Sequence, residues 1–149
     1  MTGWGGEIRR ARGGDLDGVA ALAAELAMSF RFAPESFRGN YSELLADEQA
    51  CLLLAADGPE ILGYLLGFRH LTFNANGPVG WVEEVVVRGT RRGTGIGRAL
   101  MDGFEQWASD GGCALVALAT RRAAPFYRAL GYEESATYFR KITDGRAPR

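Results

Sequence analysis

The feature that most constrains this chain is a glycine-rich loop between a strand and a helix. Residues 85–87 are three valines with high strand propensity, and the change to arginine and glycine directly after them ends the strand. Apolar residues then recur every three to four positions, which predicts a helix with one buried face: Ile96, Leu100, Phe104, Trp107 and Ala108. The loop therefore directs free backbone N–H groups and the positive end of the helix dipole at one point, which suits a phosphate or pyrophosphate.

The spacing of the loop glycines disfavours the two best-known phosphate-binding motifs. A Walker loop ends in Gly-Lys-Ser/Thr, and this loop contains no lysine. A dinucleotide fingerprint that began at Gly93 would need glycine or alanine where Arg98 stands, and one that began at Gly95 would need it at Leu100. The remaining pattern is Arg92-x-x-Gly95-x-Gly97, and on these residues alone a purely structural turn is an equally good interpretation.

Length and composition predict one globular domain. The chain has 149 residues, so we expect a single domain over residues 1–149 with its core at about residues 7–142. A net charge of −1 gives no general attraction for nucleic acid or acidic lipid. The longest apolar run, residues 61–68, is much shorter than the roughly 20 residues that span a membrane. Residues 1–6 lack signal-peptide character, so a cytoplasmic protein is expected.

The sequence predicts no metal site. Cys51 and Cys113 each lie in a stretch predicted as a buried strand, which favours core packing over a disulfide or a nucleophile. His70, the only histidine, ends an apolar strand and is expected at the surface. These residues are too few and too scattered to provide a set of metal ligands.

The order of elements predicts the fold class. Strands are expected over residues 7–12, 51–56, 61–71, 81–87, 114–119 and 137–142. Asp15 is a good N-cap for a first helix that runs to about Phe30, whereas residues 31–41 are a loop or a broken second helix. Pro125 and Gly131 bound a short helix over residues 126–130, and residues 144–149 are expected to be a frayed tail. This order predicts an α/β (α+β) domain with a mixed central sheet.

Two motifs in this order resemble those of the GNAT N-acetyltransferases. The first is the Arg92-x-x-Gly95-x-Gly97 loop, and the second, more specific one is Phe126-Tyr127-x-x-Leu130-Gly131-Tyr132. The resemblance implies a mostly antiparallel central sheet that is flanked by helices and splayed at the central strand. It also implies transfer of the acetyl group of acetyl-coenzyme A (acetyl-CoA) to a primary amine of a small molecule or a peptide, by direct attack in a ternary complex. Neither a metal nor a nucleic acid or membrane partner is implied.

The resemblance assigns the cofactor contacts residue by residue. Exposed backbone groups of the central strand would pair with the pantetheine arm, with the Val85 N–H as the donor to the oxyanion, and the loop N–H groups would hold the pyrophosphate. Many family members have an asparagine seven residues before the tyrosine, where this chain has the shorter Thr120. The cofactor-binding residues implied are Val85, Val86, Val87, Arg92, Gly93, Thr94, Gly95, Ile96, Gly97, Arg98 and Thr120.

Acetyl transfer from a thioester to an amine needs a neutral amine, donors for an oxyanion and a proton for the thiolate. By resemblance Tyr127 is the general acid, since an ordinary tyrosine with a pKa of about 10 stays protonated at neutral pH. Glu83 is the favoured base and Glu84 a residue of substrate binding or structure, although each could equally be a solvated or hydrogen-bonded acid. Strand alternation places the two on opposite faces unless a bulge changes the count.

Contacts to the acceptor and the competing functions stay open at this point. Phe30, Phe32 and Phe73 lie in segments that line the acceptor cleft in proteins similar to this one, and an apolar cluster is an equal alternative. A non-catalytic sensor or interaction module that binds coenzyme A (CoA) is the main rival, and a nucleotide-binding protein is a remote one. A homodimer is common among similar proteins.

Overall fold

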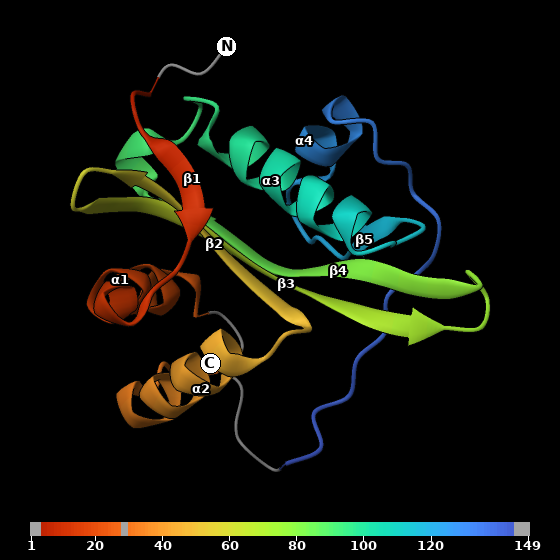
Figure 1. Cartoon of the computed structure of the whole chain (residues 1–149), viewed down its shortest axis with the longest axis horizontal. Coiled ribbons are helices and arrows are strands. Elements are labelled where there is room, and N and C mark those ends of the chain that lie inside the picture. The colour runs from red at the N-terminus through yellow and green to blue at the C-terminus, as the bar shows by residue number, and fades with distance from the viewer. Residues whose placement is uncertain (1–3, 28–29, 145–149) are drawn as a thin grey trace.

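The computed structural model describes residues 4–27 and 30–144, and its centre is a sheet of order β1-β2-β3-β4-β5 (Figure 1). All neighbouring strands pair antiparallel except β4 and β5, which are parallel. The mixed, mostly antiparallel sheet expected above is therefore present. The strands are β1 (Glu7–Arg10), β2 (Ala50–Asp57), β3 (Glu60–Thr72), β4 (Gly77–Val87) and β5 (Val116–Leu118).

Helices cover both faces of the sheet. Figure 1 shows α1 (Leu16–Leu26) and α2 (Pro34–Ala46) on one face, and α3 (Ile96–Asp110) with the short α4 (Ala124–Ala129) on the other. Two single 3-10 turns, Gly13–Asp15 and Gly89–Arg91, precede α1 and follow β4. This arrangement gives two hydrophobic clusters, one between the sheet and α3 and one between the sheet and the α1/α2 pair.

Phe104 fills the centre of the α3 cluster. Its side chain is fully buried, and a Cβ added at Gly67 of β3 would lie only 2.3 Å from its ring. A Cβ at Gly80 of β4 would also meet the ring, at 3.3 Å. The two strand glycines therefore leave the space that the phenylalanine occupies, which is the usual reason for glycine inside a strand.

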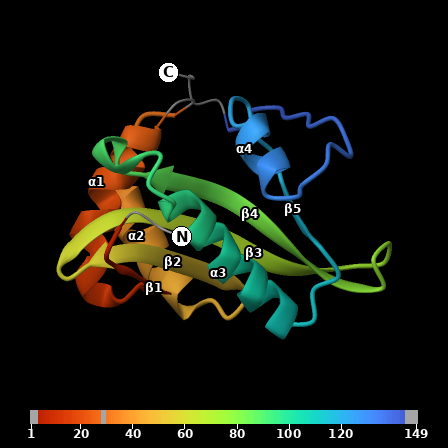
Figure 2. The ribbon, with the colours of Figure 1, turned by 90° about the horizontal axis from the view of Figure 1, so that it is seen from above.

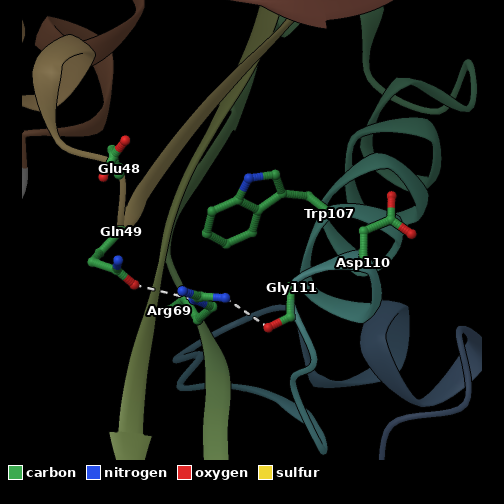
Figure 3. Close-up of a pocket in the computed structure, with 6 residues that line it drawn as sticks. All are labelled: Glu48, Gln49, Arg69, Trp107, Asp110 and Gly111. Atoms are coloured by element: carbon green, nitrogen blue, oxygen red, sulfur yellow. Dashed lines mark hydrogen bonds between the residues drawn. The ribbon is translucent and has the colours of Figure 1, made fainter.

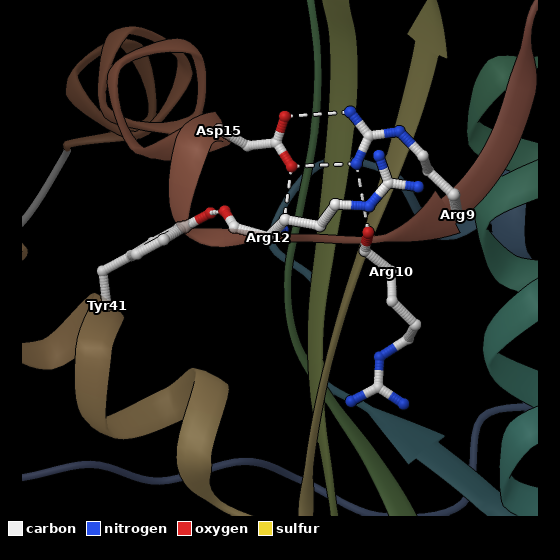
Figure 4. Close-up of polar contacts among 5 residues, drawn as sticks. All are labelled: Arg9, Arg10, Arg12, Asp15 and Tyr41. Carbon is white, nitrogen blue, oxygen red and sulfur yellow. Dashed lines mark hydrogen bonds and ion pairs between the residues drawn. The ribbon is translucent and has the colours of Figure 1, made fainter.

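Polar contacts fix the start of α1 to β1 and to α2 (Figure 4). The Arg9 guanidinium donates to both oxygens of the Asp15 carboxylate, at 2.8 and 2.9 Å, and this bond lowers the pKa of Asp15. Asp15 also accepts the Arg12 N–H, and the Tyr41 hydroxyl donates to the Arg12 carbonyl at 2.7 Å. Asp15 thus stands directly before α1, as predicted, but its carboxylate makes no cap to that helix.

Two predicted strands differ from the structure. Residues 137–142 form no strand, and the side chains of Tyr138 and Phe139 are 58% and 86% exposed. The prediction was wrong because strand propensity needs a neighbouring strand and a buried face, and this segment has neither. β5 covers only three of the six residues predicted. Cys113, which was expected in a buried strand, lies half-buried before β5, whereas Cys51 is fully buried in β2.

The helices differ from the predictions at their ends. The ambiguous stretch 31–41 contains the start of a regular helix, α2, with Pro34 in its first turn and Tyr41 as its buried residue. Gly39 and Asn40 obscured this helix because both have low helix propensity. α1 ends at Leu26, and residues 28–29 of the longer helix predicted lie outside the described residues, as do residues 145–149 of the predicted tail.

Candidate active site

The glycine loop has the backbone geometry of an anion site. Gly93 and Gly95 have φ values of +79° and +92°, a left-handed conformation that only glycine adopts without strain. Gly95 is the N-cap of α3, and no side chain of the described residues caps that terminus. The first N–H groups of the helix therefore remain available to an anion. Thr94 closes the loop, because its hydroxyl donates to the Arg91 carbonyl at 2.6 Å.

The arginines around the loop fall into two groups. Arg88 and Arg91 lie 3.9 and 3.8 Å from the Glu60 carboxylate, which holds both against the start of β3. Arg92 and Arg98 are exposed. Of the arginines around the loop, these two are therefore the ones placed to add positive charge to a bound phosphate.

The backbones of β4 and β5 separate beside the loop and leave a gap in the hydrogen-bonded ladder. The two strands pair only through residues 80–82 and 116–118, and in Figure 2 they diverge toward α4. The Arg88 N–H donates to the Leu62 carbonyl across the β3 side of β4. Because antiparallel ladders alternate, the N–H and C=O groups of Val85 and Val87 face the opposite side, into the gap. An extended ligand could pair with them as an added strand.

Tyr127 shares a hydrophobic cluster with the two valines whose backbone groups face the gap. It packs against the α3 cluster, as do Val85 and Val87, and its ring makes edge contacts with Phe126 and Tyr132 at 4.9 and 5.9 Å. A turn with Gly131 at φ +97° lets the Tyr132 N–H donate back to the Tyr127 carbonyl. Burial raises the pKa of Tyr127, so its hydroxyl stays protonated well above neutral pH and can donate a proton.

Contacts with α3 hold α4 against the loop. The Phe126 ring packs on the first turn of α3, where a Cβ at Gly97 would lie 3.1 Å from it. The Tyr132 hydroxyl donates to Glu105 of α3 at 2.6 Å. Thr120 accepts the Ala123 N–H at 3.1 Å, so this hydroxyl helps the chain turn into α4.

A β-bulge in β4 brings the two glutamates to the same face. Leu66 pairs with Glu84 but Gly67 pairs with Val82, so Glu83 is an extra residue in β4. Val82 packs against the α3 cluster, and Val86 packs against the α1/α2 cluster. Glu84 therefore shares the α1/α2 face with Val86, two residues further along the strand.

Each glutamate has its own hydrogen-bond donor on this face. The Trp81 indole N–H donates to Glu83 Oε1 at 3.1 Å, and the Tyr64 hydroxyl donates to Glu84 Oε1 at 2.8 Å. Glu83 is exposed and Glu84 is half-buried. Burial raises the pKa of Glu84, the nearby Glu83 raises it further, and the Tyr64 bond opposes the rise. The two glutamates therefore do not lie on opposite faces, where strand alternation alone would place them, because the bulge changes the count.

The three phenylalanines predicted to contact an acceptor are not brought together. Phe73 is fully exposed in the turn after β3. Phe32 packs against Phe37 of α2 with the two rings tilted and their centroids 5.6 Å apart. Phe30 lines a cavity of about 340 Å³ with residues 138 and 140–144, and Tyr138 stacks on Trp81 at 6.5 Å. Sequence reasoning missed Trp81 and Tyr138 because their contact joins a strand to a segment without regular structure.

A second cavity lies at the other end of α3 (Figure 3). It has a volume of about 370 Å³ and is lined by Glu48, Gln49, Arg69, Trp107, Asp110 and Gly111. Arg69 donates to the Gln49 side chain and to the Gly111 carbonyl across it. The length of α3, about 22 Å, separates this cavity from the glycine loop, so the cavity lies outside the candidate site.

Two kinds of feature are missing from the described part of the chain. No group of three or more His, Cys, Asp or Glu side chains lies close enough to hold a metal ion there. No helix among residues 4–27 and 30–144 has the length and apolar character needed to span a membrane.

Comparisons with known proteins agree on one family. The model of the acetyltransferase (GNAT) family matches residues 20–132. An aminoglycoside N(6')-acetyltransferase type 1 of Stenotrophomonas maltophilia is 36% identical over 110 residues, which are 66% of this chain and 71% of that protein. An aminoalkylphosphonate N-acetyltransferase of Salmonella typhimurium is 31% identical over 141 residues, covering 91% and 90% of the two chains. The solved aminoglycoside N-acetyltransferase AAC(6')-Iy in complex with CoA has a TM-score of 0.82 at 19% identity, over 97% and 99% of the chains.

Proposed function

The chain belongs to the acetyltransferase (GNAT) family, and we propose that it transfers the acetyl group of acetyl-CoA to a primary amine of a small molecule, by direct attack in a ternary complex. Membership of the family and the two N-acetyltransferases among its relatives make the chain an acetyl-CoA-dependent N-acetyltransferase. One structural observation carries the mechanism. The glycine loop opens α3, α4 packs on the first turn of that helix through Phe126, and Tyr127 packs on the same cluster as Val85 and Val87.

Acetyl-CoA is proposed to lie along the gap with its pyrophosphate at the start of α3. The N–H groups of residues 93–97 would bind the phosphate oxygens, and Arg92 and Arg98 would add charge. The pantetheine arm would pair with the free backbone groups of Val85 and Val87. A solved protein of this fold in complex with CoA supports the assignment.

The reaction then needs a base for the acceptor ammonium and an acid for the departing thiolate. A carboxylate of β4 takes one proton from the acceptor ammonium through water, and the freed nitrogen lone pair attacks the carbonyl carbon. The C–N bond forms as the carbonyl electrons move to oxygen, which accepts a hydrogen bond from the Val85 N–H. The carbonyl re-forms, the C–S bond breaks with its electrons on sulfur, and the thiolate takes the Tyr127 proton. The second proton lost by nitrogen restores Tyr127, and the carboxylate returns its proton to water.

A cationic acceptor is proposed because Glu83 and Glu84 share the face that it would approach. The names of the two sequence relatives, one acting on aminoglycosides and one on aminoalkylphosphonates, support small amines as the substrate class. A non-catalytic CoA-binding protein is the competing proposal. Retention of Tyr127 and of two strand carboxylates supports an enzyme.

The test is release of the CoA thiol from acetyl-CoA in the presence of a panel of amines. The panel contains aminoglycosides, aminoalkylphosphonates, amino sugars, polyamines, amino acids and peptides with a free N-terminus. We expect amine-dependent release with at least one class, and an acetylated product of the matching mass. Purified, folded protein that releases thiol no faster than the amine-free reaction with every class would contradict the proposed function.

A further inference from the structure

We propose that Glu84, and not Glu83, is the general base of the acetyl transfer, and that Tyr64 is a positioning residue that holds the Glu84 carboxylate. This inference rests on the proposed function, since it assigns the proton acceptor of that reaction. The sequence favoured Glu83. The structure gives three reasons to choose its neighbour: the fixed position of Tyr64, the place of Glu84 directly before Val85 and the different burial of the two carboxylates.

Tyr64 is held rigidly in the middle of the sheet. It pairs with Leu54 of β2 on one side and with Val86 of β4 on the other, and its side chain is 2% exposed. From this fixed position its hydroxyl donates to Glu84 Oε1 at 2.8 Å. A hydrogen bond from a buried, immobile donor restricts the carboxylate to one orientation.

Glu84 directly precedes Val85, next to the proposed reacting centre. Val85, its neighbour, presents its N–H to the gap where the acetyl oxygen is proposed to lie. Glu84 itself points to the α1/α2 face, where it contacts Tyr64. A base in this position faces an acceptor that approaches the acetyl carbon from that side, while the thioester occupies the gap.

The surroundings of Glu84 suit a proton acceptor. A general base works best when its pKa lies near the operating pH, and desolvation raises the pKa of Glu84 in that direction. Glu83 is exposed and bound by the Trp81 indole, a position that suits attraction of a cationic substrate. The two adjacent carboxylates thus have separate roles that follow from their surroundings.

Two titratable side chains act on the Glu84 carboxylate. Tyr64 of β3 and Glu83 of β4 are the titratable groups that shift its pKa. Among the described hydrophobic residues of α1 and α2 that pack on this cluster, Tyr41 is the one with a hydroxyl. The Tyr41 hydroxyl is committed to the Arg12 carbonyl (Figure 4), so it is not a partner of Glu84. Tyr64 is therefore the group whose removal should change the base.

The test is the pH dependence of kcat/KM for Tyr64→Phe, with Tyr41→Phe as the matched control. Both changes remove one buried tyrosine hydroxyl that donates a single hydrogen bond, but only Tyr64 donates to Glu84. Loss of this bond disfavours the charged carboxylate, so the acid limb of the Tyr64→Phe profile should move to higher pH. Because the lost hydrogen bond is to a charged group, kcat/KM should fall about tenfold or more on the acid side. The fall in kcat/KM on the alkaline plateau should be smaller. The acid limb of the Tyr41→Phe profile should stay at the pH of the wild type.

Two further measurements decide the outcome. The acid limb should disappear in Glu84→Gln and remain in Glu83→Gln, and the opposite pattern would overturn the proposal. Carbon NMR titration of the Glu84 carboxyl should show its pKa rise in Tyr64→Phe, and this needs no activity. If the wild type acetylates no amine, the proposed function is wrong and the base assignment falls with it; an unmoved Glu84 titration overturns the role of Tyr64 even in an active enzyme. A uniform loss across all pH values would show that Tyr64 is merely structural.

Discussion

Replacing Tyr127 with phenylalanine is expected to lower kcat by about 10²-fold or more, because general acid catalysis typically contributes factors of this size. The variant keeps the ring that packs against Phe126 and Tyr132 and loses only the hydroxyl proposed to protonate the thiolate. Affinity for CoA should change little, since the proposed cofactor contacts come from the loop and from β4. Steady-state kinetics and calorimetric titration of CoA measure the two effects separately.

The matched control is Tyr132→Phe. Tyr132 belongs to the same aromatic group, but its hydroxyl is bound to Glu105 of α3. This variant should lose stability and keep most of its kcat. Equal losses of kcat in the two variants would contradict the assignment of Tyr127 as the acid, because the effect would then come from disturbed packing of α4.

Replacing Phe104 with alanine should lower the free energy of unfolding by about 3–5 kcal/mol. Phe104 is fully buried between α3 and the sheet, where Gly67 and Gly80 leave no side chain that could close the cavity. Urea unfolding followed by circular dichroism measures the loss, which amounts to a fall in Tm of very roughly 10 °C for a chain of this size.

Phe73→Ala is the control for this prediction, because the Phe73 side chain is fully exposed. Its expected effect on the free energy of unfolding is within about 0.5 kcal/mol. A loss below about 1 kcal/mol for Phe104→Ala would contradict the packing described here. So would equal losses in the two variants.

The sequence predicted well those parts of the fold that depend on local pattern. The helix after the loop followed from apolar residues at regular spacing, and the hairpin of β2 and β3 followed from two apolar runs around a turn. The strand predicted over residues 137–142 was wrong because it does not depend on local pattern alone. Their composition favours a strand, but whether a strand forms depends on partners elsewhere in the chain.

The candidate site shows the same limit. The loop and Tyr127 could be found because each lies in a contiguous motif. The sequence could not show that Glu83 and Glu84 share one face of the sheet, since the bulge is defined by the register of β4 against β3. Tyr64 was overlooked because it lies in an apolar run, and only the paired strand shows that its hydroxyl reaches Glu84.

Thermal unfolding with acetyl-CoA, CoA, ATP and NADH, each added separately, tests the central claim most directly. Ligand at 100 times its Kd stabilises the folded state by about 2.7 kcal/mol, which raises Tm by roughly 5 to 20 °C at this size. We predict that the two CoA species raise Tm and that ATP and NADH do not. Stabilisation by ATP or NADH, with none by acetyl-CoA or CoA, would contradict the assignment of the glycine loop and the β4 gap as the acetyl-CoA site.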